Sequence, residues 1–119
     1  MNPPPLRAQH YEKYTVVEID TNTLMDPLVL ESVGNELYRL VDKEDRRNMI
    51  LDFERVQYIS SQAIGILLQL NKKLAALPHS TLTLCSVNQK LMDLLKIVRL
   101  DRLLKIKPTQ QEAVKQFQG

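Results

Sequence analysis

Glycine, cysteine and histidine are scarce in this chain of 119 residues, and each shortage excludes a class of site. The three glycines, at positions 34, 65 and 119, cannot form the glycine-rich loops that cradle nucleotide phosphates. Cys85 is the single cysteine, so no disulfide can form within the chain. Its place in the apolar run 82–85 is typical of a buried thiol and favours a reducing compartment.

The few histidines also argue against catalysis. His10 and His79 cannot be tied by spacing to Ser60, Ser61 or Cys85, so no nucleophile has a predicted base. Neither a CxxC nor an HxxxH pattern occurs, and no carboxylates cluster with the histidines. We therefore predict a protein that is not an enzyme and that has no catalytic residues, no metal and no cofactor.

Charge and hydropathy exclude two further kinds of partner. The formal charge is only +2 and aromatic residues make up 5% of the chain, which argues against nucleic acid. The longest apolar stretch, residues 64–70, is far short of the roughly 20 residues of a membrane-spanning helix. Residues 1–5 lack the pattern of a secretory signal and read as a flexible tail. We expect a soluble cytoplasmic protein without membrane insertion.

Strand and helix patterns alternate along the rest of the chain, residues 6–119, which we expect to form a single domain. Strands are predicted at 14–19, with a possible partner at 6–12, and at 48–53, 81–86 and 103–106. The run 48–53 is almost continuously apolar, which favours a central strand covered on both faces. Asp52 and Glu54, at its end, are expected to be solvated.

Helices are predicted between these strands. Asp26 before Pro27 is typical of a helix start, and that helix should end near Lys43. A second helix should run from Ser61 to Pro78, a third should begin near Asn88, and a fourth should follow residue 108. Four apolar residues of the second helix are expected to pack against the sheet: Ile64, Leu67, Leu68 and Leu74. The order predicts an α/β domain with a mixed, mainly parallel β-sheet of four to five strands covered by about four helices.

Two polar features have both a structural and a functional interpretation. Ser60 and Ser61 stand where the second helix begins, so one hydroxyl should cap the helix, or a phosphate could bind there. The basic series from Lys96 to Lys107 contains a single carboxylate, Asp101. It is interpreted first as a solvated face and second as a surface that attracts an acidic partner.

Residues 49–68 resemble the signature of STAS domains, specifically the anti-sigma factor antagonists. In that family an apolar strand ending in Asp leads to an aromatic-apolar pair, here Tyr58-Ile59, and then to an Asp-Ser-Ser/Thr-Gly-Leu-Gly turn entering a helix. The resemblance extends from about Tyr14 to Ile106. Relative to the family, Ser60 replaces Asp, Gln62 replaces the second hydroxyl residue and Ala63 replaces glycine.

The resemblance implies a binding protein that acts by partner switching. Family members bind an anti-sigma factor that is also a serine kinase, and phosphorylation of a serine in the turn ends that binding. Aligning Ile64-Gly65 with the family's Leu-Gly makes Ser61 the expected phosphorylation site, with Ser60 as the competing acceptor. The expected partner-binding residues are Ser60, Ser61, Gln62, Ile64 and Gly65.

Two functions follow from the resemblance. The first is an anti-sigma factor antagonist that regulates transcription, with a serine phosphatase as a further partner. The second is a STAS accessory or scaffold subunit of a transport system or signalling complex, which acts without phosphorylation.

Overall fold

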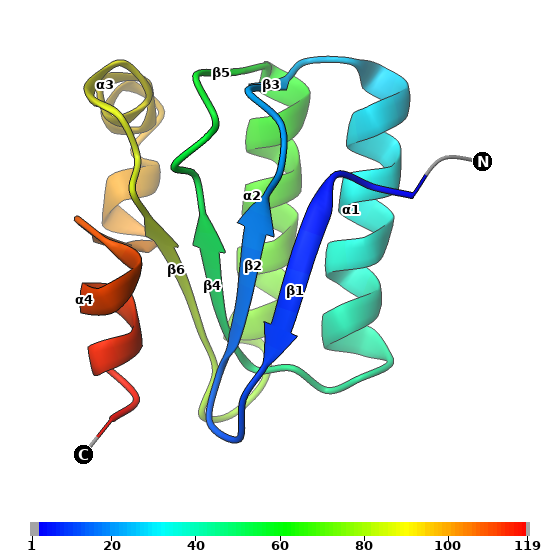
Figure 1. Cartoon of the computed structure of the whole chain (residues 1–119), viewed down its shortest axis with the longest axis vertical. Coiled ribbons are helices and arrows are strands. Elements are labelled where there is room, and N and C mark those ends of the chain that lie inside the picture. Colours follow the sequence, from blue (N-terminus) through cyan, green and yellow to red (C-terminus); the bar gives the residue numbers. More distant parts are fainter. Residues whose placement is uncertain (1–2, 119) are drawn as a thin grey trace.

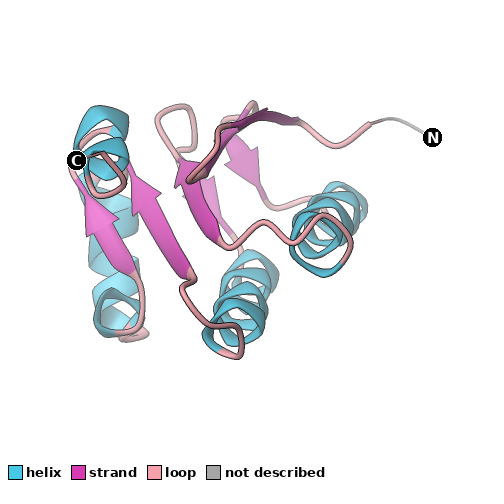
Figure 2. Cartoon of the chain, turned by 90° about the horizontal axis from the view of Figure 1, so that it is seen from below, coloured by secondary structure: helices cyan, strands magenta, loops and turns pink. Residues whose placement is uncertain are grey.

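The computed structural model describes residues 3–118 and contains a mixed five-stranded sheet with helices on both faces (Figures 1 and 2). The first two strands are antiparallel, and the other neighbouring strands are parallel. In sheet order the strands are β1 (Leu6–His10), β2 (Thr15–Ile19), β4 (Asn48–Asp52), β6 (Thr81–Cys85) and β7 (Lys105–Lys107). The predicted α/β class, with a mainly parallel sheet, is confirmed.

Helices cover the two faces of the sheet unequally. The described residues form α1 (Pro27–Asp42), α2 (Ser61–Ala75), α3 (Gln89–Ile97), the 3-10 turn η1 (Leu100–Arg102) and α4 (Gln110–Lys115). The first three helices lie on one face, and α4 contacts β4, β6 and β7 on the other (Figure 2). None of the helices within residues 3–118 has the length and apolarity needed to span a membrane.

The first helix forms as its sequence predicts. The side chain of Asp26 accepts a hydrogen bond from the backbone N–H of Leu28 at 2.9 Å, and Pro27 occupies the first turn. The predicted apolar stripe is buried along the whole helix, at Leu30, Val33, Leu37, Leu40 and Val41. The helix ends at Asp42, one residue before the expected Lys43.

The central strand β4 is buried on both faces, as predicted from its continuous apolar run. Met49 and Leu51 pack into the large core beneath α1, α2 and α3. Ile50 points to the other face and packs with Cys85 and with Ala113 of α4. Apolar side chains on both faces thus place β4 in the middle of the sheet. The position of β4 in turn determines where the loop that leads to α2 begins.

The expected solvation of Asp52 is wrong. Asp52 is only 4% exposed, because α4 covers its face of the sheet, whereas Glu54 is exposed. One carboxylate oxygen accepts a hydrogen bond from the backbone N–H of Glu54 at 2.9 Å, and the other accepts one from Gln110 Nε2 at 2.7 Å. The buried carboxylate therefore joins the end of β4 to the first turn of α4.

One expected packing contact and one expected strand boundary are also wrong. Leu68 does not pack against the sheet: it is 43% exposed, because Leu67, Leu70 and Leu74 form the buried stripe of α2. The last strand begins at Lys105 and not at Leu103, because the chain first makes the 3-10 turn η1. Residues 1–2 of the predicted tail lie outside the described residues, and the carbonyl of Pro5 accepts a hydrogen bond from the N–H of Asp20.

Candidate functional site at the start of α2

The first residues of α2 lie at the end of the molecule toward which β2 and β4 point (Figure 1). The loops that follow the parallel strands meet at this end, so residues far apart in sequence become neighbours. In open α/β sheets, binding sites lie outside the carboxyl ends of the strands. The position of Ser60 and Ser61 in the fold is therefore one at which binding is common.

A small second sheet holds the segment that precedes the serines. The two-residue strands β3 (Thr23–Leu24) and β5 (Tyr58–Ile59) are parallel and paired. The backbone N–H of Ser60 donates to the carbonyl of Leu24 at 3.0 Å, which extends this pairing to the start of α2. Neither β3 nor the strand at Tyr58-Ile59 is predicted from the sequence, because two residues cannot display a periodic pattern.

Contacts with α3 fix the same loop from its other side. The side chain of Asn88 caps α3 by accepting from the N–H of Leu91 at 2.8 Å. Its Nδ2 donates to the carbonyl of Val56 at 3.3 Å, and Val56 and Phe53 are both buried. The loop between β4 and α2 is therefore attached to β3 on one side and to α3 on the other.

Ser60 has the capping role that was one of the two interpretations of the serine pair. It has extended backbone angles, and its Oγ accepts a hydrogen bond from the N–H of Ala63 at 3.3 Å. Its carbonyl accepts the first helical bond, from Ile64. Ser60 is also half-buried, so its hydroxyl is committed to holding the helix end.

Ser61 is the first residue of α2 and is exposed. A helix N-terminus carries partial positive charge and free N–H groups, both of which favour an anion at this position. Gln62 and Gly65 are exposed beside Ser61, whereas Ile64 is half-buried and packs against the core. Of the five residues expected to bind a partner, Ser61, Gln62 and Gly65 thus form the outer surface, while Ser60 and Ile64 support it from below.

Gly65 is not required by the packing of the chain. Apart from its own helix turn, a Cβ atom at this position would have no atom of the described residues within 4 Å. Gly34 of α1 differs, because a Cβ there would lie 3.4 Å from the Ile66 side chain of α2. Glycine inside a helix costs roughly 0.5–1 kcal/mol relative to alanine. A side chain would therefore contact Ile66 at position 34, whereas at position 65 it would meet nothing outside its own helix turn among the described residues.

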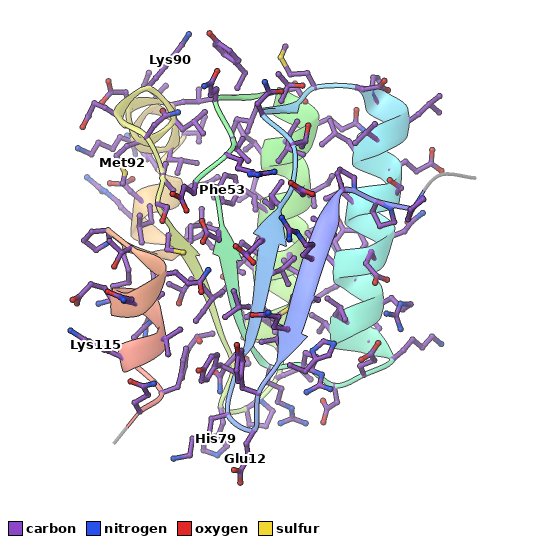
Figure 3. All side chains as sticks on the ribbon, viewed as in Figure 1. Glu12, Phe53, His79, Lys90, Met92 and Lys115 are labelled. Carbon is purple, nitrogen blue, oxygen red and sulfur yellow. The ribbon has the colours of Figure 1, made fainter. Side chains whose placement is uncertain are left out.

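Cys85 and His79, the nucleophile and the base considered beside the serines, are not placed for catalysis with Ser61 in the part of the chain that the structure describes. Burial, with the neighbouring Asp52 carboxylate, raises the pKa of the Cys85 thiol to about 12, so it remains neutral. His79 lies at the opposite end of the molecule from α3 (Figure 3). No group of three or more His, Cys, Asp or Glu side chains suited to a metal ion occurs between residues 3 and 118.

Comparison with known proteins identifies the family of this fold. The STAS domain model matches residues 6–113. An anti-sigma-factor antagonist (STAS) domain protein from Planctomyces limnophilus has a TM-score of 0.85 and 19% sequence identity, covering 98% of this chain and 99% of its own. The phosphorylated Bacillus cell fate determinant SpoIIAA has a TM-score of 0.73 at 16% identity, with coverage of 93% and 97%.

A third similar structure comes from the stressosome, described as a signal integration and transduction hub. Its TM-score is 0.67 at 16% identity, with coverage of 93% of this chain and 95% of that chain. Curated protein sequences give no significant match. Because the family match spans residues 6–113 and the fold agrees over nearly the whole chain, the protein belongs to the STAS domain family.

Proposed function

We propose that the protein is an anti-sigma factor antagonist, a non-catalytic regulator of transcription. It binds an anti-sigma factor that is also a serine kinase, and phosphorylation of Ser61 releases that partner. The similarity to a STAS antagonist and to phosphorylated SpoIIAA supports this function. The observation that carries the proposal is the exposure of Ser61 at the first position of α2. Such a regulator works in the cytoplasm, where the sigma factor is.

The local geometry favours Ser61 over Ser60 as the phosphate acceptor. The hydroxyl of Ser60 already accepts a hydrogen bond from Ala63 and is half-buried, so a kinase would have to open the helix end to reach it. Ser61 needs no such opening. Its Oγ would attack the γ-phosphorus of ATP, lose its proton and release ADP, and the product phosphate would remain at the helix N-terminus. A serine phosphatase would reset the switch by hydrolysing the phosphate.

Mass spectrometry after incubation with the cognate serine kinase and ATP tests this function. We expect one phosphate, on Ser61, and none in Ser61→Ala. A phosphate on Ser60 in the wild-type chain would contradict the assignment of the switch to Ser61. Absence of phosphate from both serines, with an active kinase confirmed on its own substrate, would contradict the phosphoswitch itself.

A Gly65→Ala substitution should separate stability from partner binding. Removing the flexibility of glycine should raise the free energy of unfolding by roughly 0.5–1 kcal/mol, because outside its own helix turn the new Cβ would have no atom of the described residues within 4 Å. The same methyl group would enter the interface with the kinase and should weaken binding about tenfold. Urea denaturation and isothermal titration calorimetry measure the two effects.

Gly34→Ala is the matched control for this experiment. It makes the same change in helix propensity, but its new Cβ contacts the side chain of Ile66 in α2. The free energy of unfolding should therefore rise less than in Gly65→Ala, or should fall. Kinase binding should stay unchanged. If Gly65→Ala binds the kinase as tightly as the wild type, Gly65 lies outside the interface.

The scaffold or accessory function is the second candidate, and the similarity to the stressosome chain favours it. The replacement of three turn residues of the antagonist signature, at Ser60, Gln62 and Ala63, points the same way. A chain that carries no phosphate after incubation with the kinase, yet assembles into a larger complex in size-exclusion chromatography, would support this candidate.

A further inference from the structure

An apolar groove lies between β5 and α3, beside the start of α2. It has a volume of about 360 Å³. Three of the side chains that line it are large, apolar and solvent-accessible: Ile97 is 77% exposed, Met25 53% and Tyr58 45%. Buried Leu91 and half-buried Leu94 and Ile59 complete the apolar lining, and Lys90 and Asp93 also line the groove. Figure 1 shows α3 and β5 at the same end of the molecule, so the groove adjoins the surface around Ser61.

The walls of this groove are already ordered in the free chain. Tyr58 belongs to β5, which pairs with β3, and the ammonium of Lys90 lies 4.4 Å from the centre of the Tyr58 ring. The hydrogen bond from Asn88 to the carbonyl of Val56 joins the start of α3 to the loop that leads into β5. A preformed groove requires little ordering when a ligand binds, which favours affinity.

The segment that forms one wall is strongly basic. Residues 90–107 contain six Lys and Arg against two Asp, a formal charge of +4, whereas ten cations against twelve carboxylates give the rest of the chain −2. The turn of α3 that carries Ile97 is flanked by exposed Lys96 and Arg99.

The arginines of this segment also differ from the others in their pairing. Arg99 and Arg102 form no ion pair with any carboxylate of residues 3–118, although both are exposed. All arginines outside the segment are ion-paired: Arg7, Arg39, Arg46, Arg47 and Arg55. Cations without partners beside exposed apolar side chains complement a ligand that combines apolar groups with carboxylates.

We propose that the groove between β5 and α3 binds an acidic, amphipathic segment of the partner protein. Apolar side chains of that segment fill the space between Tyr58 and Ile97, and its carboxylates pair with Lys90, Lys96 and Arg99. This inference rests on the proposed function, because it takes the partner to be the same kinase that reaches Ser61.

The shape and charge of the surface favour such a segment over other occupants. A membrane is flat and would leave the groove unfilled, and it would press the Asp93 carboxylate against anionic headgroups. A second copy of the chain docking through the same face would bring two basic segments together, which like-charge repulsion opposes.

Binding of the full chain to its cognate kinase tests the groove. Ile97→Glu should weaken binding at least about tenfold, because it places a carboxylate where the acidic segment must dock. The double variant Lys96→Glu/Arg99→Glu should do the same and should reduce the salt dependence of the affinity. All three residues are exposed, so thermal unfolding should be little changed.

Two controls separate the groove from general effects of charge and exposure. Leu103→Glu removes another exposed apolar side chain of the basic segment that does not line the groove. Lys13→Glu reverses a charge next to Glu12, at the opposite end of the molecule from Lys90 (Figure 3). Both variants should bind the kinase like the wild type. Equal binding by wild type and Ile97→Glu would overturn the inference and leave the proposed function standing.

A kinase-independent probe distinguishes failure of the groove from failure of the proposed function. If the wild type does not bind the kinase, the proposed function fails. The groove is then tested by anisotropy with a fluorescent helical peptide that has leucine on one face and glutamate on the other. Binding that Ile97→Glu abolishes, and that a lysine version of the peptide lacks, would support the inference. Preference for phosphatidylglycerol vesicles, self-association, or no peptide binding would overturn it.

Discussion

Phosphorylation of Ser61 is expected to weaken the complex with the kinase by about two orders of magnitude. A phosphoserine adds about −1.5 to −2 charges. Burying an ion in an interface costs several kcal/mol unless matching cations surround it, and each 1.4 kcal/mol is tenfold in affinity. Ser61 is exposed beside Gln62 and Gly65 on the surface proposed to bind the partner, so its phosphate would enter that interface.

The same phosphate should leave the fold intact. Ser61 begins α2, where the helix dipole favours an anion by roughly 0.3–1 kcal/mol, and its hydroxyl is exposed. The phosphorylated chain should therefore melt at the same temperature as the free chain or slightly above it. A phosphate on Ser60 would stand on a half-buried residue whose Oγ already accepts the hydrogen bond from Ala63, so the helix end would have to rearrange to accommodate it.

Three serine variants test the different roles of Ser60 and Ser61. Ser61→Ala should bind the kinase in the presence of ATP and should not be released. Ser61→Asp should be released only in part, because one carboxylate carries less charge than a phosphate. Ser60→Ala should lose about 1 kcal/mol of stability with its helix cap but should still be switched. Calorimetric affinities that are equal for free and Ser61-phosphorylated chains would contradict the switch.

The long elements were predictable from sequence because their signals are local. The helix that begins at Pro27 has a capping side chain, a first-turn proline and a stripe repeated over four turns, and β4 has a continuous apolar run. Gln62, Ile64 and Gly65 of the candidate site were expected only from the family resemblance, whereas the serine pair is a signal of the same local kind, since it stands at a helix start. Signals of this type depend on a few neighbouring residues, so they can be recognised without knowledge of the fold.

What sequence could not show depends on pairing between distant segments. The strands β3 and β5 are two residues each and exist because residues 23–24 meet residues 58–59. Asp52 becomes buried because α4, reached only after residue 108, folds back over β4 and supplies Gln110. The groove beside Tyr58 likewise requires α3 to approach β5. Neither the periodicity nor the composition of the sequence predicts these contacts.

The difference between two adjacent leucines of α2 provides the second large effect. Leu67 is 4% exposed and belongs to the main core, whereas Leu68 is 43% exposed. Leu67→Ala should lower the free energy of unfolding by about 2–5 kcal/mol, a large share of the roughly 5–15 kcal/mol typical of a domain.

Leu68→Ala removes the same atoms from the same helix, so it controls for helix propensity and should cost no more than about 0.5 kcal/mol. Urea denaturation of the two variants measures both changes directly. Equal losses would contradict the orientation of α2 on the sheet. That orientation also sets the direction in which Ser61 and Gly65 face, because all four residues belong to one continuous helix. A large loss at Leu67 with little loss at Leu68 would therefore support the outward orientation of the surface on which the proposed switch depends.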